Sequence, residues 1–527
     1  MKAKRILSLL LTLVMLAGCT SAFAEAQFPL TTEPVTFKVM ARTNSFYPNQ
    51  NLGDVANMKA YEEMTGVHIE WENVDPSVFN NTLAASIAGD ELPDIIMKAA
   101  LSNSQMFEWG EDEILVDIAP YIDTCMPNFK ALLEKYPDIA KAITAPNGAI
   151  YGLPQVVLAP QMRVPDKMYI NQKALEKTGK EMPKTTDDLY ELLVAIRDCD
   201  LNGNNVADEI PLVASVNFLY YYFYGCFGLG TRGVAHHTVV DVDPDTNELR
   251  IFAQSDNYRK FLEYLHKLYS EKLIYQEIFT DGNKSVAALS GEQRLGISCD
   301  TTLYNIPTEY VSDWVGLKWQ LAGPDGDNKV ANVRSNLHTT GNFAVTTACE
   351  NVELALKWVD YFYGEEGSLF YHAGVKDVNW EVKADGTLGY TEATAATRTA
   401  DMTQDTFIAQ FAMWPGGRNP AVMMDNLWGG EYEAEPASTA FAMMDYIPET
   451  VWPIFSWTEE ENKVINTVQN DISTFISTST AQAIAGEVEI TDEWWNNFVS
   501  QIDAMGGAKL LAAYQTAVER IYNGGAY

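Results

Sequence analysis

Positive charge is scarce in this sequence of 527 residues. Lys and Arg together number 36, whereas Asp and Glu number 71, and the formal net charge is −35 at pH 7. A surface of this sign repels nucleic-acid phosphates and anionic lipid head groups, so we expect no nucleic-acid partner. Beyond the amino-terminal segment, no apolar run approaches the roughly 18 residues that a membrane-spanning helix needs.

Recognisable catalytic motifs are also missing: the sequence has no Gly-x-Ser-x-Gly, no His-Glu-x-x-His and no phosphate-binding Gly-Lys-Ser/Thr loop. It contains only 6 histidines. The adjacent His236 and His237 would point to opposite faces of a strand, so a shared metal is not expected. The glycines of residues 228–233 match a dinucleotide-binding pattern, but strand-like residues follow where a helix would be needed. We expect no catalytic residues and no enzymatic activity.

The amino-terminal residues have the pattern of a secretory signal. A basic segment, residues 2–5, precedes an apolar run at residues 6–16 that is too short to span a bilayer. Two processing patterns follow. Ala22-Phe23-Ala24 fits an ordinary small-x-small cleavage site, whereas Leu16-Ala17-Gly18-Cys19 resembles the lipobox of bacterial lipoproteins, in which the cysteine is acylated. We favour the lipobox, because it lies directly at the end of the apolar run.

This interpretation gives a signal peptide at residues 1–18, then lipidated Cys19 and a flexible tether over residues 19–34. The protein would lie on the extracellular face of the bacterial cytoplasmic membrane and reach that membrane through its lipid anchor only. An odd number of cysteines would remain, without Cys-x-x-Cys spacing, so we expect isolated buried thiols in place of metal clusters or redox pairs. They are Cys125, Cys199, Cys226, Cys299 and Cys349.

Strand and helix patterns alternate after the tether. Alternating β-rich segments at residues 35–40, 67–72 and 93–97 are separated by helical patterns at 55–65 and 77–88. This order predicts a parallel sheet with right-handed crossovers. Ligands of such sheets bind at the carboxyl ends of the strands. Those ends are Ala41–Tyr47, Asn73–Asp75 and Lys98–Ser102.

A second α/β region begins near Arg163, with a strand at residues 167–171. Thr185 is placed to cap the following helix, with Asp188 three residues later. Strands are predicted at 294–298 and 341–346. Apolar residues recur at helical spacing in the carboxy-terminal part of the chain, which is therefore expected to be helical. The fold class is α/β.

One loop carries a specific ligand pattern. In Asp200–Glu209, oxygen-bearing side chains occupy positions one, three, five, nine and ten, and the carbonyl at position seven is available. Calcium takes about six to eight oxygen ligands in such a flexible loop. The loop differs from an EF-hand, because glycine stands at position four and Pro211 stands where the bidentate glutamate should be; Glu209 could supply that carboxylate. The alternative is a solvated polar turn.

We favour calcium in a structural role, because three carboxylates this close would repel one another without a cation. The expected ligands are Asp200, Asn202, Asn204, Val206, Asp208 and Glu209.

Aromatic residues are abundant, with 12 Trp, 26 Tyr and 22 Phe. Most must lie in the core, but several stand in Gly- and Pro-containing loops, where an exposed ring is expected. Flat rings offer apolar platforms for the C–H faces of sugars, while carboxylates, amides and arginines bind the hydroxyls. The set therefore favours a large saccharide-like ligand. It comprises Phe46, Tyr47, Trp109, Tyr151, Trp314 and Trp414.

Strings along the whole chain resemble a known family. With the lipobox and the two α/β halves, they are similar to the extracellular solute-binding lipoproteins of bacterial ABC importers, specifically the long oligosaccharide-binding branch. The residues of the calcium loop resemble, position by position, the loop of the alginate-binding members. The strings are Asn147–Pro154, Met168–Leu175, Pro183–Leu189, Tyr363–Gly367 and Ile484–Glu487.

The resemblance implies a two-lobed, periplasmic-binding-protein-like fold of type II, with a mixed sheet flanked by helices in each lobe and extra carboxy-terminal helices. Lobe 1 would comprise residues 35–158 and about 335–400, and lobe 2 residues 159–334 and about 401–527. Closure of a hinge would capture an oligosaccharide, and the closed monomer would present it to the permease subunits of an ABC importer.

Eight residues are expected at the cleft. The resemblance places Tyr151, Asp300, Tyr304 and Trp414 there. Phe46 and Trp109 are candidates as loop aromatics, and Arg163 and Arg418 as local basic groups. The acidic composition disfavours a polyanionic ligand unless such a local basic cleft overrides it.

Two other functions stay open. A binding module that delivers its ligand to a membrane sensor would have the same sequence features. A secreted glycoside hydrolase or lyase would use paired carboxylates, but the missing catalytic motifs argue against it. The sequence does not identify the sugar.

Overall fold

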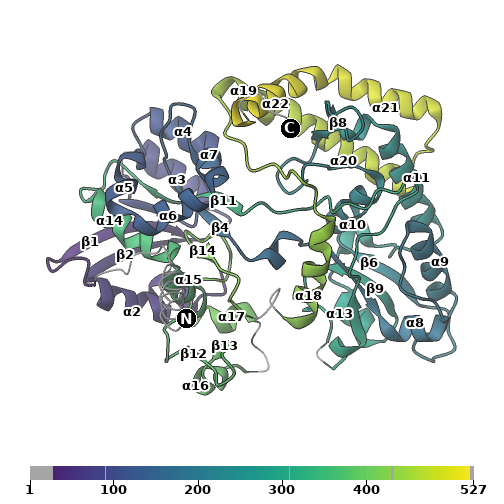
Figure 1. Cartoon of the computed structure of the whole chain (residues 1–527), viewed down its shortest axis with the longest axis horizontal. Coiled ribbons are helices and arrows are strands. Elements are labelled where there is room, and N and C mark those ends of the chain that lie inside the picture. The colour runs from purple at the N-terminus through teal and green to yellow at the C-terminus, as the bar shows by residue number, and fades with distance from the viewer. Residues whose placement is uncertain are drawn as a thin grey trace, which may run out of the picture.

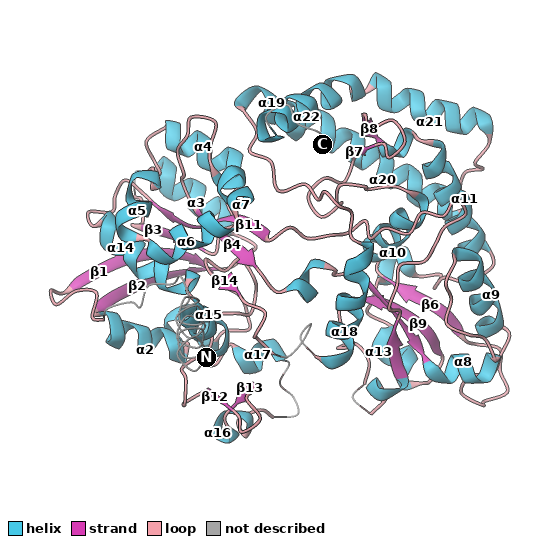
Figure 2. Ribbon diagram, viewed as in Figure 1, coloured by secondary structure: helices cyan, strands magenta, loops and turns pink. Residues whose placement is uncertain are grey.

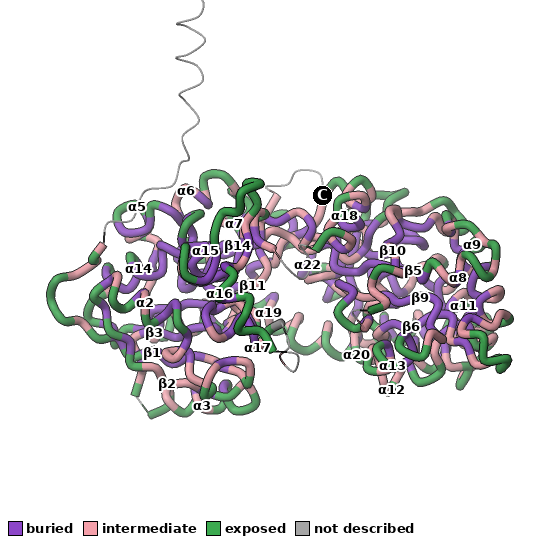
Figure 3. The backbone as a smooth tube through the Cα atoms, turned by 90° about the horizontal axis from the view of Figure 1, so that it is seen from below, coloured by how far each residue is buried: buried purple, intermediate pink, exposed green. Residues whose placement is uncertain are grey.

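The computed structural model describes residues 28–522, apart from residues 90, 308, 400, 401, 403 and 429–432. Cys19 and the signal peptide expected at residues 1–18 lie outside the described residues. Two bodies, lobe 1 and lobe 2, lie side by side (Figure 1), and buried residues fill the interior of each (Figure 3). No helix in the described part of the chain has the length and apolar content needed to cross a membrane.

Lobe 1 is built on a six-stranded mixed sheet. Its strands are β1 (Val35–Arg42), β2 (Val67–Val74), β3 (Ile95–Met97), β4 (Leu153–Val157), β11 (Leu337–Val345) and β14 (Val422–Met423). Their order is β14-β4-β11-β3-β1-β2. β1 runs parallel to β2 and β3, as the alternating strand and helix patterns predict, whereas β11 runs antiparallel to β3 and β4.

Helices cover both faces of this sheet (Figure 2). Phe37 and Val39 of β1 belong to the buried cluster on one face, and Met40 belongs to the cluster on the other, as the twofold periodicity of a strand requires. A small hairpin of β12 (Trp380–Val382) and β13 (Leu388–Tyr390) extends the lobe. The helices are α2 (Ala56–Thr65), α3 (Phe79–Ala88), α4 (Asn103–Glu111), α5 (Ile122–Cys125), α6 (Pro127–Lys135), α7 (Pro137–Ile143), α14 (Val352–Asp360), α15 (Glu365–Ala373), α16 (Glu392–Ala395) and α17 (Gln404–Ile408).

Lobe 2 contains a four-stranded mixed sheet, in the order β10-β5-β9-β6. These strands are β5 (Lys167–Asn171), β6 (Ile210–Ala214), β9 (Leu295–Asp300) and β10 (Trp314–Gly316), and a separate hairpin joins β7 (Val240–Val242) to β8 (Leu249–Ile251). The surrounding helices are α8 (Gln172–Thr178), α9 (Thr186–Arg197), α10 (Val216–Tyr224), α11 (Asp256–Ser270), α12 (Ile278–Asp281), α13 (Val286–Gly291) and α18 (Ala434–Met443).

The carboxy-terminal part of the chain is helical and packs on lobe 2, as expected. It contains α19 (Glu459–Val464), a π-helical segment (Ile465–Gln469), α20 (Asn470–Ala485), α21 (Asp492–Ala504) and α22 (Gly507–Tyr522). Ile472, Phe498 and Tyr514 join the same buried cluster as the strands of lobe 2. The five cysteines of the described chain are free, and four of them are buried, which confirms the expected isolated thiols.

Two boundaries differ from the expectation. Residues from about 401 were expected in lobe 2, but β14 pairs in parallel with β4 and extends the sheet of lobe 1. The described end of the expected tether is also not a free linker. The backbone N–H of Leu30 donates to the Thr65 carbonyl at 2.9 Å, and the Phe28 ring lies 5.3 Å from that of Tyr361. Lobe 1 holds this segment because an apolar ring and a backbone donor find partners on its surface.

Among the described elements, three pairs that follow one another in the chain lie in different lobes: β4 and β5, β10 and β11, and β14 and α18. The first two of these crossings are bonded to each other. The backbone N–H of Arg334 donates to the Arg163 carbonyl at 2.9 Å, and the Asn332 amide donates to the Asp166 carboxylate at 2.9 Å. Burial raises the pKa of Asp166 to about 7, against the lowering effects of Asn332, Arg334 and Lys167.

The predicted cap of α9 provides a test of stability. The Thr185 hydroxyl accepts the backbone N–H of Asp188 at 3.0 Å, and the Asp188 carboxylate accepts the N–H of Thr185 at 3.0 Å. Thr185→Ala should lower the free energy of unfolding by about 1 kcal/mol, because a helical N–H loses its acceptor. Thr185→Ser, which keeps the hydroxyl, should recover most of the loss in urea denaturation. Equal stability of the two variants would contradict the cap.

Asp166 gives a pH-dependent test. Its pKa of about 7 exceeds the ordinary 3.8, so its stabilising contribution is fully present below pH 3.8 and is lost as the pH rises towards 7. The melting temperature of Asp166→Asn relative to the natural protein should therefore rise from pH 4.5 to pH 7.5 and then level off. Asp138→Asn, at a carboxylate that is 87% exposed, is the control and should show no such trend.

Candidate functional site

The carboxyl ends of the parallel strands lie at facing edges of the two lobes. β4 leads directly into the first crossing, and β3 has the same direction as β4 because both run antiparallel to β11. β5 begins at that crossing and β9 runs antiparallel to it, so the end of β9 returns to the same side. The strand ends of both sheets therefore meet near the crossings, where ligands of such sheets bind.

The edge of lobe 1 brings together three of the predicted ligand residues: Phe46, Trp414 and Arg418. The Tyr47 hydroxyl donates to the carbonyls of Met413 and Pro415, which places the segment around Phe46 against Trp414. The guanidinium of Arg418 donates to the Ala99 carbonyl at 2.6 Å, just after β3. Phe46, Trp414 and Arg418 are each partly exposed.

The edge of lobe 2 holds Asp300 at the end of β9. The amides of Asn283 and Asn305 donate to its carboxylate at 3.0 and 2.8 Å. Burial raises the pKa of Asp300, and these donors together with Lys167 oppose that shift. Nearby polar groups thus fix the orientation of a half-buried carboxylate at the strand end, which suits it to accept a hydroxyl donor.

Tyr304 follows on the same edge and is 53% exposed. Its pKa is raised, first by burial of the hydroxyl and then by the carboxylates of Glu433 and Asp405. Asp405 belongs to α17 of lobe 1. The Tyr304 side chain of lobe 2 therefore lies within electrostatic reach of lobe 1, across the space between the facing edges.

Three rings that were expected to be exposed are buried, and one of them is Tyr47, which is 3% exposed. Tyr151 is 7% exposed, and a Cβ built on Gly110 of α4 would meet its ring within 2.5 Å. Trp314 is 3% exposed within β10. The expectation failed because the loop composition around each ring does not show that another element covers it. Trp109 lies on α4 and packs against the cluster that contains Tyr151, so it is not grouped with Trp414.

Arg163 lies on the first crossing and not at a strand end. It lines a hollow of about 260 Å³ together with Tyr136 of lobe 1 and Pro453 and Tyr522 of the carboxy-terminal part. Burial lowers its pKa. This position makes it a residue of the hinge region.

Sequence reasoning missed a larger hollow between the lobes. Its volume is about 570 Å³, and α4 of lobe 1 and the α19 region of lobe 2 form its two sides. Phe107 and Trp457 contribute rings, and Glu108, Asn462 and Lys463 contribute polar groups. No local pattern could reveal it, because its two walls are about 350 residues apart in the chain and meet only through packing.

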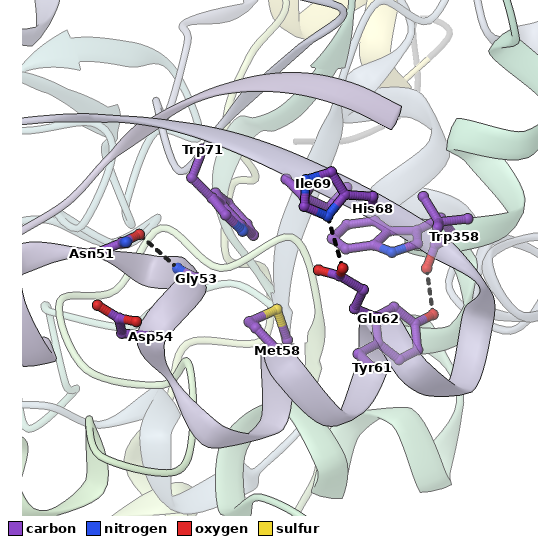
Figure 4. A pocket seen from close by; sticks show the side chains of 11 residues that line it. Asn51, Gly53, Asp54, Met58, Tyr61, Glu62, His68, Ile69, Trp71 and Trp358 are labelled. Carbon is purple, nitrogen blue, oxygen red and sulfur yellow. Dashed lines mark hydrogen bonds and ion pairs between the residues drawn. The ribbon is translucent and has the colours of Figure 1, made fainter. Parts of the chain in front are cut away.

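A smaller pocket belongs to lobe 1 alone (Figure 4). It has a volume of about 160 Å³ and lies between α2 and β2, where Tyr61, Trp71 and Trp358 line it. A Glu62–His68 pair, 2.7 Å apart, lies in its wall. Because this pocket involves only one lobe, it does not join the facing edges.

The loop predicted to bind calcium is a turn organised by its own oxygens. The backbone N–H of Asn204 donates to Asp200 and to Asn202, both at 3.0 Å, so these two side-chain oxygens lie close together. The Asn204 oxygen accepts the N–H of Val206 at 2.7 Å. The Glu209 carboxylate accepts the N–H of Leu201 at 2.8 Å.

These oxygen donors fit a hard cation in their chemistry. Asp208, however, pairs with Arg294 at 3.1 Å, which already compensates one of the three carboxylates. In the described part of the chain, no group of three or more His, Cys, Asp or Glu side chains is gathered in a metal-binding arrangement. A cation here would therefore depend on amide and carbonyl oxygens as well as on Asp200 and Glu209.

Comparison with known proteins identifies the family. Residues 49–368 match the family described as bacterial extracellular solute-binding protein. The fructooligosaccharide ABC transporter substrate-binding protein FusA of Streptococcus pneumoniae serotype 4 is 30% identical over 369 residues, which cover 67% of each chain. Lipoprotein LipO of Bacillus subtilis is 24% identical over 395 residues, covering 72% of this chain and 74% of LipO.

A solved structure supports the same fold. The structure of an EF-hand mutant of S. pneumoniae FusA in complex with fructo-nystose superposes with a TM-score of 0.73 at 23% identity, covering 93% of this chain and 100% of that one. The predicted α/β fold with a mixed sheet in each lobe is thereby confirmed. This chain belongs to the family of bacterial extracellular solute-binding proteins.

Proposed function

We propose that this protein captures an oligosaccharide between its two lobes and delivers it to the permease of an ABC importer. The observation that carries the proposal is the pair of facing strand-end edges, with Trp414 on lobe 1 and Tyr304 on lobe 2. Family membership and the fructooligosaccharide named for FusA support it. Closure of the lobes would bring both rings onto the sugar, while groups such as Asp300 would replace water around its hydroxyls.

Binding without reaction follows from this proposal. No step of hinge closure breaks a bond, so the bound sugar should be recovered intact. The protein would act as a monomer, and acylation of Cys19 would hold it at the outer face of the cytoplasmic membrane. The name of LipO as a lipoprotein supports that anchor.

The proposed function is tested by titration calorimetry with kestose, the sugar named for another solved structure of FusA, and with longer and chemically different oligosaccharides. At least one should bind, and mass spectrometry should recover it unchanged. Tyr304→Ala should weaken binding of that sugar by roughly tenfold, about 1.4 kcal/mol, because a stacking surface is lost. Tyr304→Phe, which keeps the ring, should retain most of the affinity. Hydrolysis of the sugar, or no binding across the panel, would refute the proposal.

We also propose that the loop Asp200–Glu209 holds a structural Ca²⁺. Asp200, Asn202, Asn204, Val206, Asp208 and Glu209 would provide its oxygens, and the EF-hand named for FusA supports such a site in a relative. When bound, the cation would neutralise the carboxylates and hold α9 to β6.

Removal of calcium should therefore lower the melting temperature, and calcium in excess should restore it. Asp200→Asn should reduce that calcium-dependent shift. Asp385→Asn is the matched control: like Asp200, which accepts the N–H groups of Asn204 and Asn205, Asp385 accepts a backbone N–H, that of Thr387, in an exposed turn, but it lies in lobe 1. Equal calcium dependence in both variants would contradict the assignment.

A further inference from the structure

Three cationic side chains converge at the strand-end edge of lobe 1: Arg42, Lys98 and Arg418. Arg42 ends β1, and Lys98 follows β3 directly in the adjacent position of the sheet, since Ala41 pairs with Met97. Arg418 approaches from the loop before β14 and donates to the carbonyl of Ala99, next to Lys98. The cluster is notable in a chain that has about twice as many acidic as basic residues.

Lys98 forms the centre of this cluster and is 2% exposed. Its ammonium donates to the Asn419 amide oxygen at 2.6 Å and to the Met413 carbonyl at 3.2 Å. It also lies 5.8 Å from the ring centre of Tyr47 and 6.0 Å from that of Tyr371. All of these partners are neutral. The backbone of Lys98 has φ = +56°, a strained conformation for a non-glycine residue.

No carboxylate balances these three charges within ion-pair distance among the described residues: none of Arg42, Lys98 and Arg418 has an acidic side-chain oxygen within 4 Å. The facing edge of lobe 2 differs, because Lys167 there acts on the carboxylates of buried Asp166 and half-buried Asp300. Buried charges in proteins are ordinarily paired. Asp75, directly after β2, lies close enough for Arg42 to help lower the pKa of its carboxyl, so Arg42 is partly compensated at longer range. Lys98 and Arg418 are thus the charges of this edge that lack a counter-charge among the described carboxylates.

We propose that the sugar captured by this protein carries an oxyanion, a carboxylate or a sulfate or phosphate ester, which binds to Arg42, Lys98 and Arg418 at the edge of lobe 1. The inference rests on the proposed function and specifies the chemical class of its ligand. Guanidinium groups bind two oxygens of a carboxylate or of a phosphate-like group through two parallel hydrogen bonds, and the buried ammonium adds charge in a water-poor environment. The net negative charge of the protein repels an acidic sugar, whereas the three cationic groups at this edge attract it.

The surroundings of Lys98 also predict a proton uptake. Burial, and then Arg42 and Arg418, lower the pKa of Lys98 to about 7. Tyr47, Tyr371 and His372 are the other titratable groups around it, and the carboxylate of Asp405 acts on Tyr47. An anion favours the protonated ammonium, so binding should take up protons near pH 7.5, and affinity should fall between pH 6.5 and 8.5.

The experiment compares a trigalacturonate with its neutral methyl ester by titration calorimetry, and a sulfated neutral trisaccharide with its unsulfated form. In the natural protein, one of the acidic sugars should bind at least about tenfold more tightly than its neutral partner, a difference of about 1.4 kcal/mol. Binding of the uronate alone assigns the site to carboxylates, whereas binding of both acidic sugars assigns it to oxyanions in general. Proton uptake should appear as a change of the observed binding enthalpy when the titration is repeated in buffers of different ionisation enthalpy.

Arg42→Gln and Arg418→Gln should each reduce the preference for the acidic sugar several-fold. Arg259→Gln, on the outer helix α11, is the matched control and should keep it. Circular dichroism checks that each variant is folded. The comparison of acidic with neutral sugars uses the natural protein alone, so it tests the inference even if a variant fails to fold. Equal affinity for acidic and neutral sugars would overturn the inference and leave the proposed function intact. No binding of any saccharide would overturn both.

Discussion

The two sheets do not share a hydrophobic core, and the function depends on this separation. Each buried cluster of the described chain lies within one lobe or on one face of its sheet. Contacts between the first two crossings are hydrogen bonds, such as those from Asn332 to Asp166 and from Arg334 to Arg163. Relative motion of the lobes can therefore bend the crossings while both close-packed interiors stay intact.

The same topology places the polar residues that follow the strands near the hinge. Each crossing starts or ends at a strand, so the polar residues that follow the strands of one lobe face those of the other. The two edges differ in charge: Asp300 on lobe 2 is held by amides and Lys167, whereas Lys98 on lobe 1 has only neutral partners. Each edge also carries a ring: Trp414 lies on the edge of lobe 1 and Tyr304 on the edge of lobe 2. A reversible clamp for a hydroxyl-rich ligand needs rings and polar groups of this kind, and no bond has to be broken.

Local patterns predicted local structure well. The capping box of Thr185 and Asp188 formed because both partners lie within one helical turn, and β1, β2 and β3 formed as parallel neighbours because short crossover helices leave few other topologies. Prediction failed where a distant segment decides the outcome. β14 joins β4 although about 265 residues separate them, and Gly110 covers the Tyr151 ring.

The sequence by itself determined the α/β class, the family resemblance, the helix cap and the strand ends where a ligand would bind. These follow from periodicity and from groups close together in the chain. Only the tertiary structure decided which rings stay exposed and that the α19 region forms the wall opposite α4 in the hollow between the lobes. It also decided that Arg42, Lys98 and Arg418 form one cluster. Burial and charge compensation arise from segments hundreds of residues apart, and no local pattern specifies how such segments pack.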